Sequence, residues 1–200
     1  MGNLRSVEKA FERVGVAVER TTDAERAERA EGLVLPGVGA FGEAMRRLRA
    51  LGFDELVRGR AARGGPVLGI CLGYQLLFES SEEGSATEGL GLLEGAVGRL
   101  DAPGLKIPHM GWERVDWSQA SPLVDGIPTA TPFYFVHSLT PRPAEERIVL
   151  GRSRHGESFA CAVASGPLHG VQFHPEKSSA AGLRLLGNFA GICARAGAAA

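Results

Sequence analysis

Cys71 has the clearest chemical potential of any residue in the sequence, because it lies in GICLG between Gly69 and Gly73. The apolar run before it predicts a buried strand, and a nucleophile between two glycines at a strand end is typical of a nucleophile elbow. The glycines are needed because the sharp turn brings backbone and neighbouring side chains too close for a Cβ. A helix is expected to begin at the cysteine, and its positive end favours a thiolate. The alternative is a buried structural cysteine beside a glycine turn.

The segment GVQFHPE offers the base that a thiol nucleophile needs. His174 follows an apolar strand, Pro175 ends the hydrogen-bonding pattern of that strand, and Glu176 lies two residues beyond the histidine. At that spacing the carboxylate can reach the imidazole, fix its tautomer and stabilise its charged form. A loop histidine beside a surface glutamate is the alternative interpretation.

A third glycine-rich segment, PGVGAF at 36–41, also follows an apolar strand. Gly37 and Gly39 free the backbone to direct N–H groups outward, as an oxyanion hole requires, although a plain turn would use the same residues. The predicted oxyanion donors are Gly37, Val38 and Gly39, together with Leu72 after the nucleophile. Since open α/β sheets place their sites at the carboxyl ends of strands, the three segments predict one thiol acyl-transfer site. In it the thiol attacks a carbonyl and the imidazole moves the protons.

The elements that must position these segments alternate along the first half of the chain, where apolar runs and helical patterns indicate parallel βαβ units. The predicted strands of this half lie at 16–18, 33–35 and 66–70. The first predicted helix has Leu4, Val7, Phe11 and Val14 at helical spacing and stops at Gly15. A short helix, AERAERA, is predicted after Asp23, and the next has Met45, Leu48 and Leu51 on one face. Two more are predicted, one over 53–62 and one that begins with YQLLFES.

The second half has short strand patterns at tight spacing, which predict some antiparallel pairs. They lie around 96–100, 113–116, 133–136, 147–152, 158–164 and 168–173, before a last helix over about 179–194. The predicted fold class is therefore α/β: a single domain over residues 1–200, with a mixed, mostly parallel central sheet flanked by helices and extra antiparallel strands in the second half. No strand pattern precedes the first helix, so we expect either that the fold starts with a helix or that the first strand of a βαβ fold is missing from this sequence.

Composition argues against several classes of protein. The chain has 200 residues and a net charge of −1 without a basic block, so nucleic-acid binding is not expected. Three cysteines without a CxxC pair argue against a disulfide framework, and Cys161 and Cys193 fit apolar core patterns. No pair of histidines combines metal-ligand spacing with a cysteine or carboxylate cluster, so a metal site is not expected. Without a secretory signal or an apolar run near the ~18 residues of a membrane span, we expect a cytoplasmic protein.

PGVGAF, GICLGYQLLFESSEEG and GVQFHPEKS together resemble the class I, triad-type glutamine amidotransferases. GNLRSVEKAFERVG, IPHMGWERV, FYFVHS and GLRLLGNF are similar to one branch of that family, the glutaminase subunits of imidazole glycerol phosphate synthase. The resemblance implies hydrolysis of glutamine to glutamate and ammonia through a cysteinyl thioester, with Cys71, His174 and Glu176 as the triad. It also implies a heterodimer with a (β/α)₈ cyclase subunit, which uses the ammonia to make imidazole glycerol phosphate and an aminoimidazole carboxamide ribotide in histidine biosynthesis. A glutaminase subunit of this kind is expected to need no cofactor and no metal.

The resemblance also implies roles for residues outside the triad. Glutamine contacts are implied at Gly37, Gln75, Glu83, His137, Ser138 and Leu139. Glu83 would pair with the substrate ammonium and Gln75 with its polar groups, and a solvated helix residue is the alternative for each. Contacts with the cyclase are implied for Asn3, His109 and Lys177. The alternative for His109 is an ordinary loop histidine, and the alternative for Lys177 is a solvated lysine.

Three other functions remain open at this point. A class I amidotransferase subunit of anthranilate, purine or pyridoxal phosphate synthesis would share the triad, although GNLRS, IPHMGW and HPEKSS speak against it. A thiol hydrolase of the α/β-hydrolase type would place its acid before the histidine, whereas Glu176 follows His174 by two residues. The third is a catalytically inactive docking subunit, whose support is the missing first strand.

Overall fold

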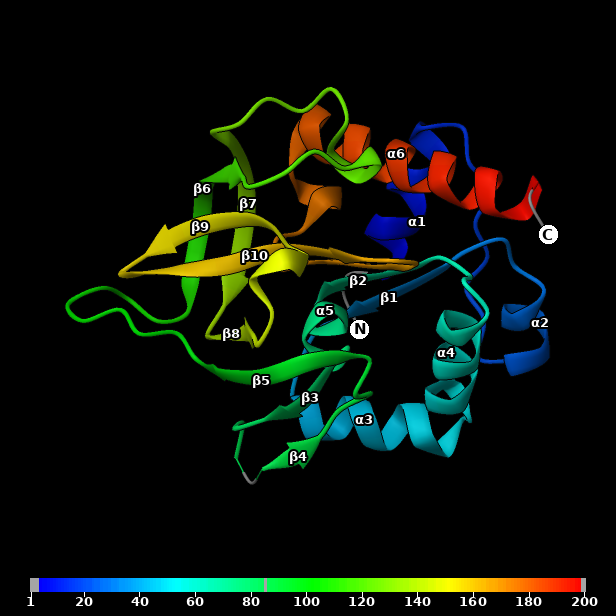
Figure 1. The fold of residues 1–200 in the computed structure, drawn as a ribbon, viewed down its shortest axis with the longest axis horizontal. Helices are drawn as coiled ribbons and strands as arrows, with labels where there is room; N and C mark the ends of the chain where they lie inside the picture. Colours follow the sequence, from blue (N-terminus) through cyan, green and yellow to red (C-terminus); the bar gives the residue numbers. More distant parts are fainter. Residues whose placement is uncertain (1–3, 85, 199–200) are drawn as a thin grey trace.

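Two β-sheets organise the protein in the computed structural model, which describes residues 4–84 and 86–198 (Figure 1). The larger sheet has seven strands in the order β1-β2-β11-β10-β9-β6-β7. They are β1 (Leu33–Gly37), β2 (Val67–Cys71), β6 (His109–Trp117), β7 (Thr131–His137), β9 (Val149–His155), β10 (Glu157–Ser165) and β11 (Leu168–Val171). The strands β1, β2 and β11 run parallel, and the remaining neighbours pair antiparallel. The predicted α/β class with a mixed sheet and antiparallel strands in the second half is confirmed, but among the described residues two neighbouring pairs of this sheet are parallel and four are antiparallel, so it is less parallel than expected.

The smaller sheet and the helices complete the architecture. This sheet has the order β4-β3-β5-β8, and β8 has no counterpart among the predicted strands. Its strands are β3 (Phe78–Ser81), β4 (Thr87–Glu88), β5 (Leu93–Arg99) and β8 (Leu139–Pro143). The α-helices are α1 (Leu4–Arg13), α2 (Ala24–Glu28), α3 (Phe41–Ala50), α4 (Phe53–Ala62), α5 (Leu72–Leu76) and α6 (Ser179–Ala198), and 3₁₀ turns cover Pro122–Val124, Glu146–Ile148 and Pro175–Lys177.

Helices cover both faces of the parallel strands, which bury their residues accordingly. The helices α1 and α6 lie on one face, whereas α3, α4 and the smaller sheet lie on the other (Figure 1). Leu68 and Ile70 of β2 join the core that includes α1 and α6 residues, and Val67 joins the core that includes α3 and α4 residues. This alternation is the one that a strand imposes, and all five residues of β2 are buried, as is usual for a parallel strand covered on both faces.

The prediction of a strand at 16–18 is wrong. Val16 and Val18 pack partly against the core, but no residue of this segment joins a sheet. A strand requires a neighbour for its backbone hydrogen bonds, and an apolar alternation does not reveal whether a neighbour is present. Within the described residues, β1 forms one edge of the larger sheet and no strand lies beyond it.

The predicted helices are present, with differences at several of their ends. Asp23 caps α2 by accepting backbone N–H bonds, and α4 coincides with the predicted segment 53–62. Leu51, which was expected on the buried face of α3, lies just beyond the end of that helix and is 47% exposed. The helix opened by YQLLFES is limited to α5, because the Leu76 carbonyl accepts a hydrogen bond from the backbone of Leu90 in a distant loop.

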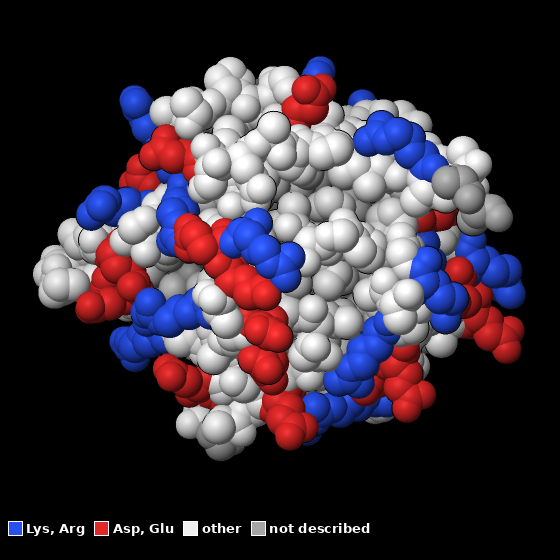
Figure 2. All heavy atoms as spheres, in the orientation of Figure 1, with Lys and Arg blue, Asp and Glu red and all other residues white. Residues whose placement is uncertain are grey.

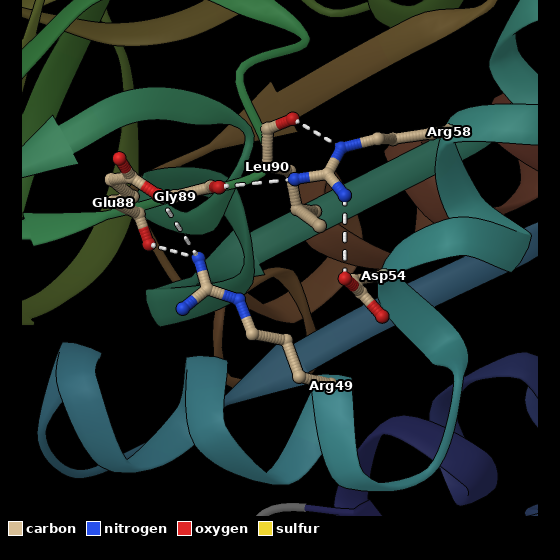
Figure 3. Close-up of polar contacts among 6 residues, drawn as sticks. All are labelled: Arg49, Asp54, Arg58, Glu88, Gly89 and Leu90. Carbon is tan, nitrogen blue, oxygen red and sulfur yellow. Dashed lines mark hydrogen bonds and ion pairs between the residues drawn. The ribbon is translucent and has the colours of Figure 1, made fainter.

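Two arginines tie the loop at 88–90 to the helices α3 and α4 (Figure 3). Nε of Arg58 donates to the Leu90 carbonyl at 2.9 Å, and its Nη1 lies 3.3 Å from Asp54. Nη2 of Arg49 donates to the Glu88 carbonyl at 3.2 Å. These bonds hold the loop that joins β4 to β5 against the helical layer.

The face of the protein drawn in Figure 2 carries charges of both signs without a large area of either one. Figure 2 shows acidic and basic side chains interleaved on the face seen in Figure 1. Many form exposed ion pairs, such as the contact between Arg26 and Glu19 at 2.7 Å. No helix within residues 4–84 and 86–198 combines the length and the apolar character needed to cross a membrane.

Candidate active site

Cys71 occupies a strained turn between β2 and α5. Its backbone has a φ of 55° and a ψ of −111°, a conformation that residues with a side chain rarely adopt. A Cβ added to Gly69 would lie 2.6 Å from the carbonyl oxygen of Gly73. A Cβ added to Gly73 would lie 1.7 Å from the carbonyl oxygen of Leu35, so neither glycine position has room for a side chain. The predicted elbow geometry is therefore confirmed, since the turn needs both glycines to present the thiol.

His174 and Glu176 form a buried pair next to this turn. The Nδ1–H of His174 donates to Oε1 of Glu176 at 2.9 Å, and both side chains are almost completely buried. Burial acts to lower the pKa of His174, but hydrogen bonds and charge interactions with Cys71 and Glu176 outweigh it and raise this pKa to about 9. At neutral pH the imidazole is therefore protonated, and a protonated imidazole is the natural counterion of a thiolate.

The segment predicted to form the oxyanion hole lies beside the elbow because β1 and β2 are parallel and in register. Gly37 is the pairing partner of Cys71, and a Cβ on Gly37 would lie 2.9 Å from the Leu72 side chain. Gly39 has a φ of 104°, which favours glycine, and Val38 between them is half exposed. The structure thus brings the two predicted glycine segments together at the carboxyl ends of adjacent parallel strands.

A pocket of about 490 Å³ opens in front of Cys71 and His174. Its volume suits a small metabolite. The other predicted residues that line it are Val38, Gly39, Leu72, Gln75, Glu83, His137, Ser138, Leu139 and Lys177. The pocket therefore collects most of the predicted site residues from segments that are far apart in the sequence.

Glu83 and Gln75 line the pocket from different segments of the chain, and hydrogen bonds hold both side chains. Oε2 of Glu83 accepts the backbone N–H of Phe41, the first residue of α3, at 2.5 Å. Nε2 of Gln75 donates to the Leu139 carbonyl and to Oε1 of Gln172, each at 3.1 Å. These hydrogen bonds orient both side chains.

Gln172 is a site residue that the sequence analysis does not identify. It is fully buried, and its Nε2 lies 3.7 Å from the sulfur of Cys71. Its signal in the sequence is a polar amide inside the apolar run that leads to His174, because a buried amide requires hydrogen-bond partners.

The three residues predicted to contact the cyclase differ in their surroundings. Lys177 lines the pocket, and its ammonium lies 5.6 Å from the ring centroid of Tyr134. His109 is buried, with its ring stacked on those of Phe135 and His155 rather than in an exposed loop. Asn3 lies outside the described residues.

The remaining cysteines are unpaired and buried, as predicted. Burial raises the pKa of Cys161 far above its usual value and raises that of Cys193 to about 11, so both thiols stay protonated. In the part of the chain that the structure describes, no group of three or more His, Cys, Asp or Glu side chains has a metal-binding arrangement.

Comparison with known proteins gives the class of the protein first. Residues 2–191 match the family described as "Glutamine amidotransferase class-I", so the chain belongs to this family. A structure titled "Crystal structure of glutamine amidotransferase" is 25% identical and has a TM-score of 0.76, over 96% of this chain and 95% of that one. The fold is also that of a structure titled "Structure of PurLQS from Thermotoga maritima", with a TM-score of 0.69 at 19% identity, over 94% of this chain and 92% of that one.

Curated relatives narrow the class to one enzyme. The chain is 51% identical over 197 residues to the imidazole glycerol phosphate synthase subunit HisH of Moorella thermoacetica, covering 98% of this chain and 93% of that one. It is 49% identical over 191 residues to the same subunit of Rhodopirellula baltica, covering 95% of this chain and 93% of that one. The protein is thus a member of the HisH family, the glutaminase subunits of imidazole glycerol phosphate synthase in histidine biosynthesis.

Proposed function

We propose that this subunit hydrolyses glutamine in the pocket beside the elbow, with Cys71, His174 and Glu176 as its catalytic residues. The observation that carries the proposal is the buried pair of His174 and Glu176, which keeps a protonated imidazole next to the strained cysteine. A structural histidine would have no comparable reason to remain charged inside the protein, because burial alone lowers its pKa.

The proposed reaction proceeds through a thioester. The Cys71 thiolate attacks the carboxamide carbon of glutamine, and backbone N–H groups of 37–39 and Leu72 stabilise the resulting oxyanion. His174 gives its proton to the leaving nitrogen, the C–N bond breaks, and ammonia departs from a γ-glutamyl thioester. The neutral imidazole then takes a proton from water as the water oxygen attacks the thioester. Glutamate leaves, and the pair of thiolate and imidazolium is restored.

The polar groups of the pocket match glutamine. Among the described residues that line the pocket, Glu83 is the one carboxylate, and it takes the α-ammonium of the substrate. Gln75 and the segment 137–139 take the remaining polar groups. Because Glu83 and Gln75 are already held by other hydrogen bonds, binding costs little side-chain entropy.

The partner that we propose is the (β/α)₈ cyclase subunit, docked over the pocket mouth. Met110 and Trp112 alternate on β6, so they share one face, and they are 63% and 52% exposed. The ring of Trp112 meets that of Tyr134 edge-on, and Lys177 lies over Tyr134. An exposed apolar patch next to a pocket suits a partner surface, and docking here would keep released ammonia away from solvent.

We also propose that the reaction takes place in the cytoplasm. The support for this location is the state of the cysteines, since Cys71, Cys161 and Cys193 are all unpaired, as expected in a reducing compartment.

Glutamate release tests the proposed function. Purified protein is assayed with glutamine alone, and then with the cyclase and its nucleotide ligand, beside a Cys71→Ala variant. We expect low release alone, strong stimulation by the liganded cyclase, and no release from the variant under either condition. Release that persists in the variant would contradict the role of Cys71, and release that the cyclase does not change would contradict the partner.

A further inference from the structure

A chain of buried hydrogen bonds leads from β6 to the segment that lines the glutamine pocket. His109 of β6 and His137 of β7 face each other in the strand pair, and His109 Nδ1 lies 3.1 Å from His137 Nε2. His137 Nδ1 in turn lies 2.8 Å from the Leu139 carbonyl oxygen. Both histidines are about 95% buried, so bulk water cannot replace these bonds.

The proton positions along this chain follow from one fixed acceptor. The Leu139 carbonyl can only accept, so His137 Nδ1 carries the hydrogen. Burial lowers the pKa of His137 to about 3 and that of His109 to about 4, so both rings are neutral near pH 7. His137 Nε2 is then a bare acceptor, and the hydrogen between the two rings belongs to His109 Nδ1. Each histidine therefore has a single allowed tautomer.

The same carbonyl connects the histidines to the nucleophile. The Leu139 oxygen accepts a second bond from Gln75 Nε2, which also donates to Gln172 Oε1. This bond fixes the amide of Gln172, so that its Nε2 faces the Cys71 sulfur at 3.7 Å. His137 and Gln75 thus donate to the same Leu139 oxygen, and a second series of donors runs from Gln75 through Gln172 to the thiol.

We propose that His109 is a positioning residue for glutamine: by donating to His137 it fixes the ring that orients the Leu139 carbonyl and, through it, the Gln75 amide in the pocket. The inference rests on the proposed function, because it takes this pocket as the glutamine site. A purely structural role for His109 would require only its flat ring, which stacks on His155 with centroids 4.2 Å apart.

The tautomers provide a direct test that needs no glutamine turnover. NMR of the free protein with isotope-labelled histidine rings reports which nitrogen carries hydrogen. We expect His109 and His137 both to carry it on Nδ1 at pH 7. Hydrogen on Nε2 of either ring would overturn the chain of donors, whatever the enzyme turns out to catalyse.

Kinetic variants separate donation from packing. His109→Phe keeps a ring for stacking but removes the donor, and it should raise the glutamine KM by about tenfold with a smaller change in kcat at saturating cyclase. His109→Asn retains an N–H donor near the Nδ1 position and should recover most of that loss. His155→Phe is the matched control, because His155 stacks on His109 without joining the chain, and its KM should stay within about twofold of wild type.

The pattern of results decides between the possibilities. A normal KM in His109→Phe, or an equal rise in His109→Asn and His109→Phe, would overturn the positioning role. The proposed function would be contradicted if the wild-type protein carried hydrogen on Nδ1 of both His109 and His137 but had no glutaminase activity with its cyclase. In that case, an unchanged glutamine dissociation constant in His109→Phe would overturn the positioning role as well.

Discussion

Gly73→Ala tests whether the nucleophile elbow depends on the close approach of α5 to β1. The new Cβ would lie 1.7 Å from the Leu35 carbonyl oxygen, which is 1.3 Å short of the 3.0 Å that Cβ contacts essentially always keep. The Leu35 oxygen is a backbone atom and a Cβ is fixed by its own backbone, so the strain cannot relax through a side-chain rotation. We expect the free energy of unfolding to fall by about 3 kcal/mol or more. Displacing the thiol and the adjacent N–H by about 1 Å should also lower glutaminase activity by about 100-fold.

Urea unfolding and glutamate release with the cyclase measure these two effects. Gly187→Ala is the matched control, because its new Cβ on α6 would meet only the Val14 side chain, at 3.9 Å. Alanine is the better helix former, so this control should be unchanged or stabilised by up to about 1 kcal/mol. The need for glycine in the elbow would be refuted if Gly73→Ala matched the control in both stability and activity.

Three further predictions concern charge and polar contacts. Glu176→Gln removes the carboxylate that helps to hold the His174 pKa near 9, so the alkaline limb of the pH–rate profile should move to lower pH and kcat should fall by at least about 100-fold. Burial lowers the pKa of His169 from 6.5 to about 4, so the unfolded state binds the extra proton and stability is lost as pH falls from about 6.5 to 4, by about 3 kcal/mol in total. His169→Phe should remove that part of the acid dependence in urea unfolding measured across this window. Arg58→Met should lower the free energy of unfolding by about 1–2 kcal/mol, since it removes the bonds to the loop at 88–90.

Each of these predictions has an outcome that would contradict it. An unshifted alkaline limb in Glu176→Gln would mean that the carboxylate does not set the protonation of His174. Equal acid slopes for wild type and His169→Phe would show that this ring does not take up the proton. Arg46→Met is the control for Arg58→Met, because Arg46 is 75% exposed and pairs only along its own helix; equal losses in the two variants would refute the role of the loop bonds.

Local chemistry explains why the turn at Cys71 and the pair of His174 and Glu176 were predictable. The glycines around Cys71 and the spacing of His174 and Glu176 are requirements of a few neighbouring residues, so the sequence displays them directly. The parallel order of β1 and β2 also follows from local patterns, because alternating strands and helices force it. These features needed no knowledge of distant contacts.

Long-range pairing explains what could not be predicted. The interior position of His109 depends on its register with His137 and on stacking against His155, which come from three different strands. The role of Gln172 depends on Gln75, almost a hundred positions earlier. The segment 16–18 shows the opposite error, in which an apolar pattern is present without a strand neighbour.

Covalent labelling tests the central claim, that Cys71 is the nucleophile of a glutamine site. The protein in complex with the cyclase is treated with a diazoketone analogue of glutamine, and the modified cysteine is located by mass spectrometry. We expect one adduct, on Cys71, whose formation glutamine slows and Glu176→Gln weakens. Labelling of Cys161 or Cys193 instead, or labelling of Cys71 that glutamine does not slow, would contradict the claim.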